Sequence, residues 1–88
     1  MIWCVELDDG IEKELRKLGK STQKKIINYL ETRIATHEDP RRFGKALRGK
    51  LSGLWRYRVG DLRIICRIED TKLIVLVITI GHRKEIYD

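Results

Sequence analysis

Four arginines in the second half of this sequence have the chemistry and spacing to bind a phosphate group. Arg56, Arg58, Arg63 and Arg67 alternate with apolar residues, as side chains on one face of a β-strand pair do. Arginine donates hydrogen bonds in a rigid fork and keeps its charge when water is removed, so guanidinium groups that share a face form an anion site. Such a site suits RNA, a pentacovalent phosphorus in a transition state, or an acidic peptide.

Two residues near the C-terminus could add to this chemistry. His82 can exchange protons near neutral pH, and Tyr87 can stack on a base. A lone histidine is more often structural, and a terminal tyrosine is commonly a packing residue, so both alternatives stay open. No His or Cys cluster has metal-ligand spacing, and Ser21 and Ser52 lack convincing His and Asp partners. We therefore expect no metal site and no cofactor.

The basic charge is concentrated in one segment. Residues 41–67 carry nine basic side chains and one acidic side chain, whereas residues 1–40 carry seven against eight and residues 68–88 three against four. Charge concentrated in this way is typical of a protein that binds a polyanion or an acidic protein. A basic surface that is merely solvated is the alternative.

The 88 residues predict a single small domain, spanning 1–88, with little room for an enclosed cofactor cavity. Acidic residues interrupt the N-terminus before any apolar run, so no signal peptide is predicted. The longest apolar stretch, residues 73–80, is too short to cross a bilayer as a helix. We expect a cytoplasmic protein with no membrane partner.

The first half predicts a strand followed by a helical hairpin. Residues 2–7 alternate like a short strand, and Asp8 and Asp9 are candidate caps for a helix that Gly19 ends. Ser21 is the candidate cap of a second helix, which Asp39 and Pro40 should stop. Its apolar stripe consists of Ile26, Ile27, Leu30 and Ile34.

The second half predicts a basic loop over residues 38–53, with one helical turn around 45–47, and then three antiparallel strands over 54–59, 62–69 and 73–80. If Gly60 and Asp61 form a two-residue turn, Arg58 lies directly opposite Arg63 and Trp55 lies opposite Cys66. Like charges directly opposite one another destabilise an antiparallel pair. The fold gains nothing from this arrangement, which indicates a functional role.

A second turn at Asp70 and Thr71 would pair Glu69 with Lys72 and place Ile74, Leu76 and Ile78 on the arginine side of the sheet. The last strand would then be apolar on both sides and lie centrally, beside the first strand. The helical hairpin should cover the other side, which carries Trp55, Tyr57 and Val59. The predicted fold class is α+β, in the order β-α-α-β-β-β. Cys4 and Cys66 are expected to be buried free thiols.

Two stretches of the chain resemble a known family. Residues 45–68, KALRGKLSGLWRYRVGDLRIICRI, and residues 80–87, IGHRKEIY, are similar to the RelE branch of the RelE/ParE superfamily of bacterial toxins. This resemblance covers nearly the whole chain and implies a RelE-like fold. It also implies the toxin of a type II toxin-antitoxin pair, which enters the ribosomal A site, cleaves the bound mRNA and is silenced by an antitoxin.

The resemblance assigns catalytic positions. Arg56 and Arg58 match a basic pair on one strand, Arg63 matches the arginine that steadies the scissile phosphate, Arg83 matches a second phosphate-side arginine, and Tyr87 matches a base-stacking tyrosine. This chain has arginine at two positions where that branch often has lysine. Lysine can lose its proton when buried among cations, whereas arginine effectively cannot.

Proton transfer would then fall to His82, alone or together with Tyr87. The implied activity is a metal-independent endoribonuclease reaction in which a substrate 2′-hydroxyl attacks the adjacent phosphate, with mRNA, ribosomal RNA and a cognate antitoxin as partners. The basic residues assigned to RNA and ribosome binding are Arg41, Arg42, Lys45, Arg48, Lys50 and Arg67. The alternatives are a ParE-like toxin that inhibits DNA gyrase without cleaving anything, and a binding module with degenerate catalysis.

Overall fold

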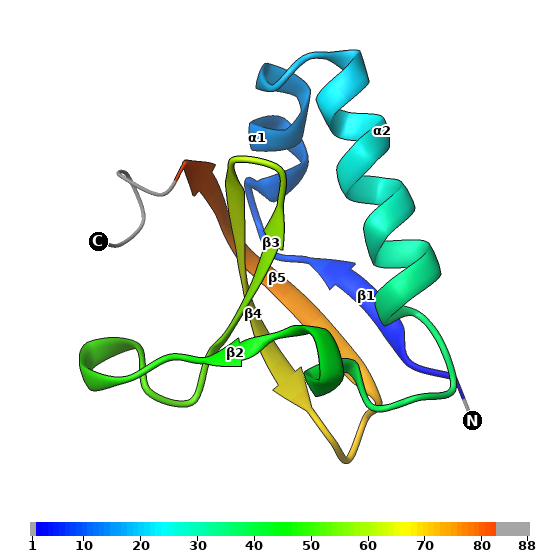
Figure 1. Cartoon of the computed structure of the whole chain (residues 1–88), viewed down its shortest axis with the longest axis vertical. Helices are drawn as coiled ribbons and strands as arrows, with labels where there is room; N and C mark the ends of the chain where they lie inside the picture. The colour runs from blue at the N-terminus through cyan, green and yellow to red at the C-terminus, as the bar shows by residue number, and fades with distance from the viewer. Residues whose placement is uncertain (1, 83–88) are drawn as a thin grey trace.

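A five-stranded mixed sheet carries two helices on one of its faces. The computed structural model describes residues 2–82, and its strand order is β1-β5-β4-β3-β2, with β1 parallel to β5 and the other pairs antiparallel (Figure 1). This architecture confirms the predicted α+β class and the placement of β5 beside β1. The elements are β1 (Cys4–Leu7), α1 (Ile11–Lys17), α2 (Lys20–Tyr29), η1 (Leu30–Ile34), η2 (Pro40–Phe43), β2 (Lys45–Ala46), η3 (Gly49–Leu51), β3 (Trp55–Val59), β4 (Leu62–Glu69) and β5 (Ile74–His82).

Glycines, rather than polar side chains, begin both helices. Gly10 is the N-cap of α1 with φ of 84°, and Gly19 is the N-cap of α2 with φ of 85°. Both values lie in the left-handed region, where only glycine is unstrained. The predicted caps Asp8, Asp9 and Ser21 are therefore wrong, although Gly19 does end α1 as expected.

The second helix ends earlier than predicted. Its last turn, η1, is wide, because the Ala35 N–H donates to the Leu30 carbonyl at 2.8 Å, five residues back. Asp39 and Pro40 begin a separate 3₁₀ turn, η2. The carboxylate of Asp39 accepts a hydrogen bond from the Arg41 N–H at 3.0 Å. The predicted stripe holds for three residues, but Ile27 is 44% exposed.

The core fills the space between the helices and the sheet. It includes Tyr57, Ile64 and Cys66 from the sheet and Ile26 and Ile34 from the helical hairpin. The hairpin therefore covers the side that carries Tyr57, as predicted. One of the two cysteines departs from the prediction, because Cys66 is buried whereas Cys4 is exposed on the edge strand.

A hydrogen bond anchors the segment before β2 to the core. The Tyr57 hydroxyl donates to the Pro40 carbonyl at 2.7 Å. Gly44 passes so close that an added Cβ would lie 3.0 Å from the Tyr57 ring and 3.2 Å from the Arg56 carbonyl oxygen. Bare backbone is therefore required at Gly44, and β2 follows directly. The helical turn predicted for residues 45–47 is wrong.

The register of the first hairpin is the predicted one. Val59 pairs with Leu62, Tyr57 with Ile64 and Trp55 with Cys66, so Gly60 and Asp61 form the two-residue turn. The strand begins at Trp55, one residue later than expected.

The register of the second hairpin differs from the prediction. Glu69 pairs with Ile74 rather than with Lys72, and the connection includes Leu73 at φ of 54°. A register shift follows between Ile65 and Cys66, which pair with Thr79 and Val77. Ile78 is therefore the extra residue of a β-bulge, and the strand reverses its sidedness there.

None of the helices in the part of the chain that the structure describes is long and apolar enough to cross a membrane.

Candidate functional site

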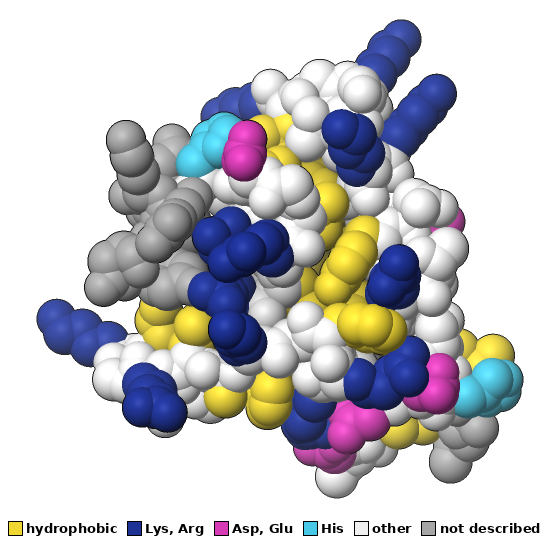
Figure 2. Space-filling model, in the orientation of Figure 1, with side chains coloured by type: hydrophobic (Ala, Val, Ile, Leu, Met, Phe, Trp, Pro, Cys, Tyr) yellow, Lys and Arg dark blue, Asp and Glu magenta, His cyan; other side chains and the backbone are white. Residues whose placement is uncertain are grey.

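The sheet face opposite the helices carries the predicted arginines. We call it the arginine face and define it by Arg56 and Arg58 of β3 and Arg63 and Arg67 of β4. Cross-strand partners share a face, so the pairs Arg58–Arg63 and Arg67–Leu76 fix which residues belong to it. Figure 2 shows basic side chains gathered over the region of β3 and β4. The structure thus brings the arginines of β3 and β4 together on one surface.

Arg58 and Arg63 form the centre of this face. They are direct cross-strand partners, as the turn geometry predicts. Arg58 is exposed, whereas Arg63 is only 5% exposed and its Nε lies buried. Burying a charge costs free energy, and a second cation opposite increases that cost. An anion that reaches Arg58 and Arg63 would lower both costs.

A second like-charged pair continues the row. Lys45 of β2 lies directly opposite Arg56 of β3, on the same side of the sheet as Arg58. This pair was missed from the sequence because residues 45–47 were expected to form a helical turn. A strand prediction through Lys45 would have revealed it.

The arginine face is less open than expected. Ile65 lies between the arginines on this side of the sheet and is only 3% exposed. Ile74 and Leu76 of β5 are half-buried. Ile65 therefore contributes almost no exposed apolar surface to the arginine face.

His82 does not join the arginines. It pairs with Leu62, whose side chain is in the core, so His82 extends from the helix-covered side of the sheet. There it helps to line a hollow of about 260 Å³ with Lys25 and Asp61. Gly81, not His82, is the cross-strand partner of Arg63. The β-bulge at Ile78 produces this separation.

Two of the predicted RNA-binding residues are engaged in ion pairs. The Arg41 guanidinium donates to both carboxylate oxygens of Asp70, at 3.0 and 2.7 Å, and lies 5.7 Å from the centre of the Trp55 ring. The hydrogen bond to Arg41 lowers the pKa of Asp70, and the same bond raises the pKa of Arg41. Arg41 therefore ties the turn after β4 to η2.

Arg42 is held in a similar way. Its guanidinium donates to Glu38 at 3.0 Å and lies 4.5 Å from the centre of the Phe43 ring. Phe43 is the last residue of η2, on the segment that leads into β2. Arg42 thus has an acidic and an aromatic neighbour of its own.

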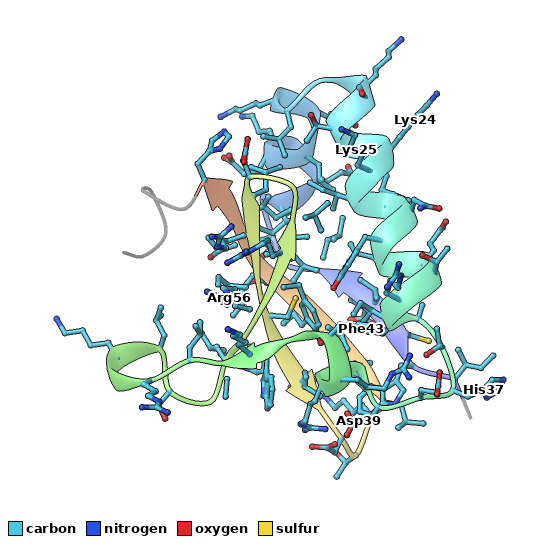
Figure 3. The ribbon with its side chains drawn as sticks, in the orientation of Figure 1. Lys24, Lys25, His37, Asp39, Phe43 and Arg56 are labelled. Atoms are coloured by element: carbon cyan, nitrogen blue, oxygen red, sulfur yellow. The ribbon has the colours of Figure 1, made fainter. Side chains whose placement is uncertain are left out.

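Three other predicted RNA-binding residues lie together. Lys45, Arg48 and Lys50 line a groove of about 440 Å³ with Arg56, and Ala46, Leu47 and Leu51 contribute apolar surface to it. We call this the basic groove. Figure 3 places Arg56 beside β2, where the groove meets the arginine face. Arg67 remains exposed on β4, farther along the arginine face.

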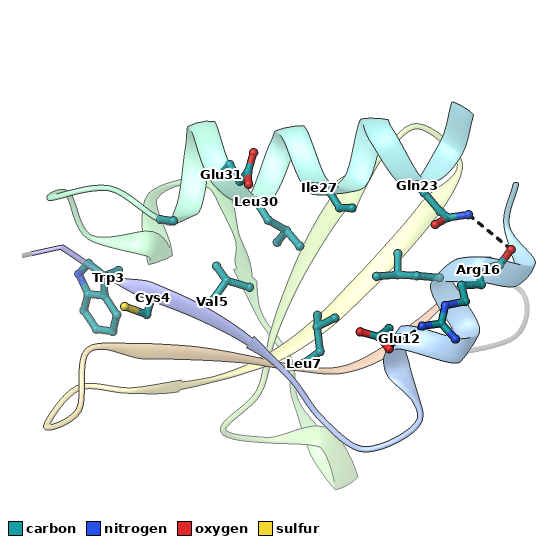
Figure 4. A pocket seen from close by; sticks show the side chains of 12 residues that line it. Trp3, Cys4, Val5, Leu7, Glu12, Arg16, Gln23, Ile27, Leu30 and Glu31 are labelled. Atoms are coloured by element: carbon teal, nitrogen blue, oxygen red, sulfur yellow. Dashed lines mark hydrogen bonds and ion pairs between the residues drawn. The ribbon is translucent and has the colours of Figure 1, made fainter. Parts of the chain in front are cut away.

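A larger hollow has a different character. It measures about 580 Å³ and lies between β1 and the α2–η1 helix (Figure 4). Val5 and Leu7 of β1 face Ile27 and Leu30 across it. Its mainly apolar lining and its position beside an edge strand suit a protein segment better than a phosphate.

The other groups singled out in the sequence belong neither to the arginine face nor to the basic groove as the structure describes them. Arg83 and Tyr87 lie outside the described residues. Within residues 2–82, no group of three or more His, Cys, Asp or Glu side chains is arranged to hold a metal ion. Burial raises the pKa of the Cys66 thiol to about 12, so this cysteine is a poor nucleophile.

Comparisons with known proteins point to one group. The family model described as the ParE toxin of the type II toxin-antitoxin system parDE matches residues 5–87. Toxin RelG of Mycobacterium tuberculosis is 28% identical over 87 residues, which cover 99% of this chain and 98% of that protein.

Solved structures agree with this match. The toxin-antitoxin complex RelBE2 of M. tuberculosis contains a chain that superposes with a TM-score of 0.84 at 25% identity, over 97% of this chain and 95% of that one. The E. coli toxin RelE, solved as a double mutant in the free state, gives 0.67 at 26% identity over 98% and 88%. The archaeal RelE–RelB complex of Pyrococcus horikoshii gives 0.73 at 20% identity over 97% and 99%, which concerns the fold alone.

Proposed function

This chain belongs to the ParE toxin family of type II toxin-antitoxin systems, within the RelE/ParE superfamily, and on that premise we propose that it is an endoribonuclease that cleaves mRNA in the ribosomal A site. The observation that carries the proposal is the pair Arg58–Arg63, a buried cation facing a second cation. Such an arrangement is costly to the fold, and a phosphate bound at the pair would lower that cost.

The proposed reaction is attack of a substrate 2′-oxygen on the adjacent phosphorus, which breaks the bond from phosphorus to the 5′-oxygen of the next nucleotide. Water accepts the 2′-hydroxyl proton and returns a proton to the departing 5′-oxygen, so the products are a 2′,3′-cyclic phosphate and a 5′-hydroxyl. Negative charge then grows on the phosphoryl oxygens, and Arg58 and Arg63 are placed to stabilise it through forked hydrogen bonds. The ribosome would splay the mRNA so that the hydroxyl and phosphorus are aligned. We further propose that the reaction needs no metal ion of the toxin's own.

The contribution of this chain is charge stabilisation more than proton transfer. Arg56 and Arg58 stand where lysines would offer a base, and His82 extends from the other side of the sheet. Arg83 and Tyr87 remain proposed phosphate and base contacts. In the sequence Arg83 follows His82, the last residue of β5, and Tyr87 lies five residues after His82.

Ribosomes programmed with a defined mRNA test the proposal. We expect the purified chain to produce new mRNA ends in the A site, detected by primer extension, and Arg63→Gln to abolish most of them. Lys24→Gln is the matched control, because it removes one positive charge from an exposed position on α2. Equal cleavage by the parent and Arg63→Gln would remove Arg63 from the reaction.

Inhibition of DNA gyrase is the second candidate function. Two observations favour it: the matching family model is that of the ParE toxin, and His82 is separated from Arg63. A DNA supercoiling assay with the same preparation decides between mRNA cleavage and gyrase inhibition. A chain that leaves ribosome-bound mRNA intact but blocks supercoiling is a gyrase inhibitor.

We also propose that an antitoxin protein silences this chain. The M. tuberculosis RelBE2 structure, to which it is similar, is a toxin-antitoxin complex. In this chain Ile27 is 44% exposed and Leu7 is 39% exposed at the apolar groove beside β1, which aliphatic side chains of a partner could fill. We expect Ile27→Asp to weaken the complex with the protein encoded beside this one, measured by calorimetry, while Lys24→Gln leaves it unchanged.

A further inference from the structure

The basic groove is built on a loop that is closed at its base. The Leu47 N–H donates to the Leu54 carbonyl at 2.9 Å, and the short turn η3 lies between them. Gly49 and Gly53 take φ values of 65° and 93°, which allow the chain to reverse within this loop. Arg48 and Lys50 are therefore held on a defined loop rather than on a loose tail.

The groove is uniformly basic. None of the described residues that line it is acidic, and in residues 2–82 no acidic side chain forms an ion pair with Lys45, Arg48 or Lys50. By contrast, Arg41 and Arg42 each have a carboxylate partner. The described carboxylates thus neutralise Arg41 and Arg42 but not Lys45, Arg48 or Lys50.

The groove is continuous with the arginine face. Arg56 lines the groove and is also the cross-strand partner of Lys45. Arg58 follows two residues later on the same face, a step of about 7 Å along a strand, and it faces Arg63. A row of cations therefore runs from the 48–50 loop to Arg63.

We propose that the basic groove binds the sugar–phosphate backbone of an RNA strand, next to the phosphate that Arg58 and Arg63 hold. This inference rests on the proposed function and identifies where the strand runs beyond the reacting phosphate. Lys45, Arg48 and Lys50 bind successive phosphates as point charges and forks, so the contact does not depend on base sequence.

An RNA strand suits the groove better than an acidic peptide does. A peptide that adds to a sheet edge gains affinity from backbone hydrogen bonds, but β2 consists of only Lys45 and Ala46. A phosphate backbone needs no such ladder, and it can continue along the row to Arg63. The strand that lies in the groove comes either from the mRNA or from ribosomal RNA.

Binding measured against salt concentration tests the proposal. The probes are a fluorescent 12-nucleotide single-stranded RNA with 2′-O-methyl groups, which prevent cleavage, ribosomes without mRNA, and a glutamate-rich peptide. The variant is Arg48→Gln/Lys50→Gln. Its control is Lys20→Gln/Lys24→Gln, which has the same net charge and alters exposed positions on α2.

For the single-stranded RNA, log K falls linearly with log salt, and each phosphate contact adds about 0.7 to the steepness of that line. The double variant lacks two contacts, so its line should be about 1.4 less steep than that of the parent. The control should keep the parent slope. A reduced salt dependence with the oligonucleotide identifies the mRNA strand as the occupant of the groove. A reduction seen only with empty ribosomes identifies ribosomal RNA as the occupant. Unchanged slopes with both RNA probes, or loss only with the peptide, would overturn the proposal.

Failure of this inference is distinguishable from failure of the proposed function. If the groove is wrong, Arg48→Gln/Lys50→Gln binds RNA like the control while the parent still cleaves mRNA on ribosomes. If the proposed function is wrong, the parent cleaves no mRNA, whatever the RNA slopes are.

Discussion

Arg58 and Arg63 face each other across β3 and β4, and the more deeply placed of the two, Arg63, is only 5% exposed. Two guanidinium groups at adjacent cross-strand positions repel each other. While the toxin is free of its substrate, no substrate phosphate offsets this repulsion between the two side chains. Stability and activity should therefore respond in different directions when the pair is altered.

The Arg63→Gln variant should lose activity without losing stability. Glutamine keeps part of the buried stem and removes the charge that faces Arg58, so we expect the free energy of unfolding in urea to stay equal or rise by about 0.2–1 kcal/mol. mRNA cleavage should fall by about 100-fold or more, because a charge-stabilising group is lost. A variant that unfolds more easily would instead show that Arg63 is a structural residue.

His82→Asn should have little effect on the reaction. His82 lies on the helix-covered side of the sheet, with Lys25 and Asp61 beside it. A general acid or base contributes about 100- to 10,000-fold, so a cleavage rate within about threefold of the parent, with the same pH profile from pH 5 to 8, excludes that role. A larger loss with an altered profile would restore His82 as the proton-transfer group.

The Arg41–Asp70 ion pair should make stability fall in acid. The hydrogen bond to Arg41 lowers the pKa of folded Asp70 below its ordinary value, so the contribution of the pair is complete above about pH 4 and is lost as the pH falls through the folded pKa. We expect the melting temperature of Asp70→Asn to be lower than that of the parent at pH 7 and to converge with it towards pH 2. Asp9→Asn, an exposed carboxylate in the turn before α1, serves as the control. A constant difference across this pH range would contradict the assignment.

The two thiols should react at very different rates. Cys4 is exposed on β1, whereas burial raises the pKa of Cys66 to about 12. Thiolate is the reactive form, so the native chain should release one equivalent from DTNB quickly at pH 8 and a second only after unfolding. Cys4→Ser should remove the fast phase. Two fast equivalents from the native chain would show that Cys66 is accessible.

Local turn chemistry explains why the central pair of the arginine face, Arg58 and Arg63, could be predicted. Gly60 and Asp61 form a two-residue turn, and such a turn leaves a single register for the strands on either side. The opposition of Arg58 and Arg63 therefore follows from the sequence alone. The helical stripe was likewise predictable through Ile26 and Ile34, because both face the core at helical spacing.

The second hairpin could not be predicted in the same way. Its connection depends on Leu73 in a left-handed conformation, which a leucine side chain does not signal. A bulge then inserts Ile78 without a partner, and this one residue moves His82 from the arginine side to the helix side. The contact between Arg41 and Asp70 joins residues 29 positions apart, so it depends on the finished fold.

The parallel pairing of β1 with β5 has a consequence for how the toxin is made. The first strand of the sheet has no neighbour until the last described strand exists, and β4 also needs β5 on one of its sides. Closing a sheet between distant parts of a chain is a late and slow step. During translation, a nascent chain from which β5 has not yet emerged therefore lacks the strand that completes the sheet around Arg63, so the arginine face cannot assemble before β5 has been made.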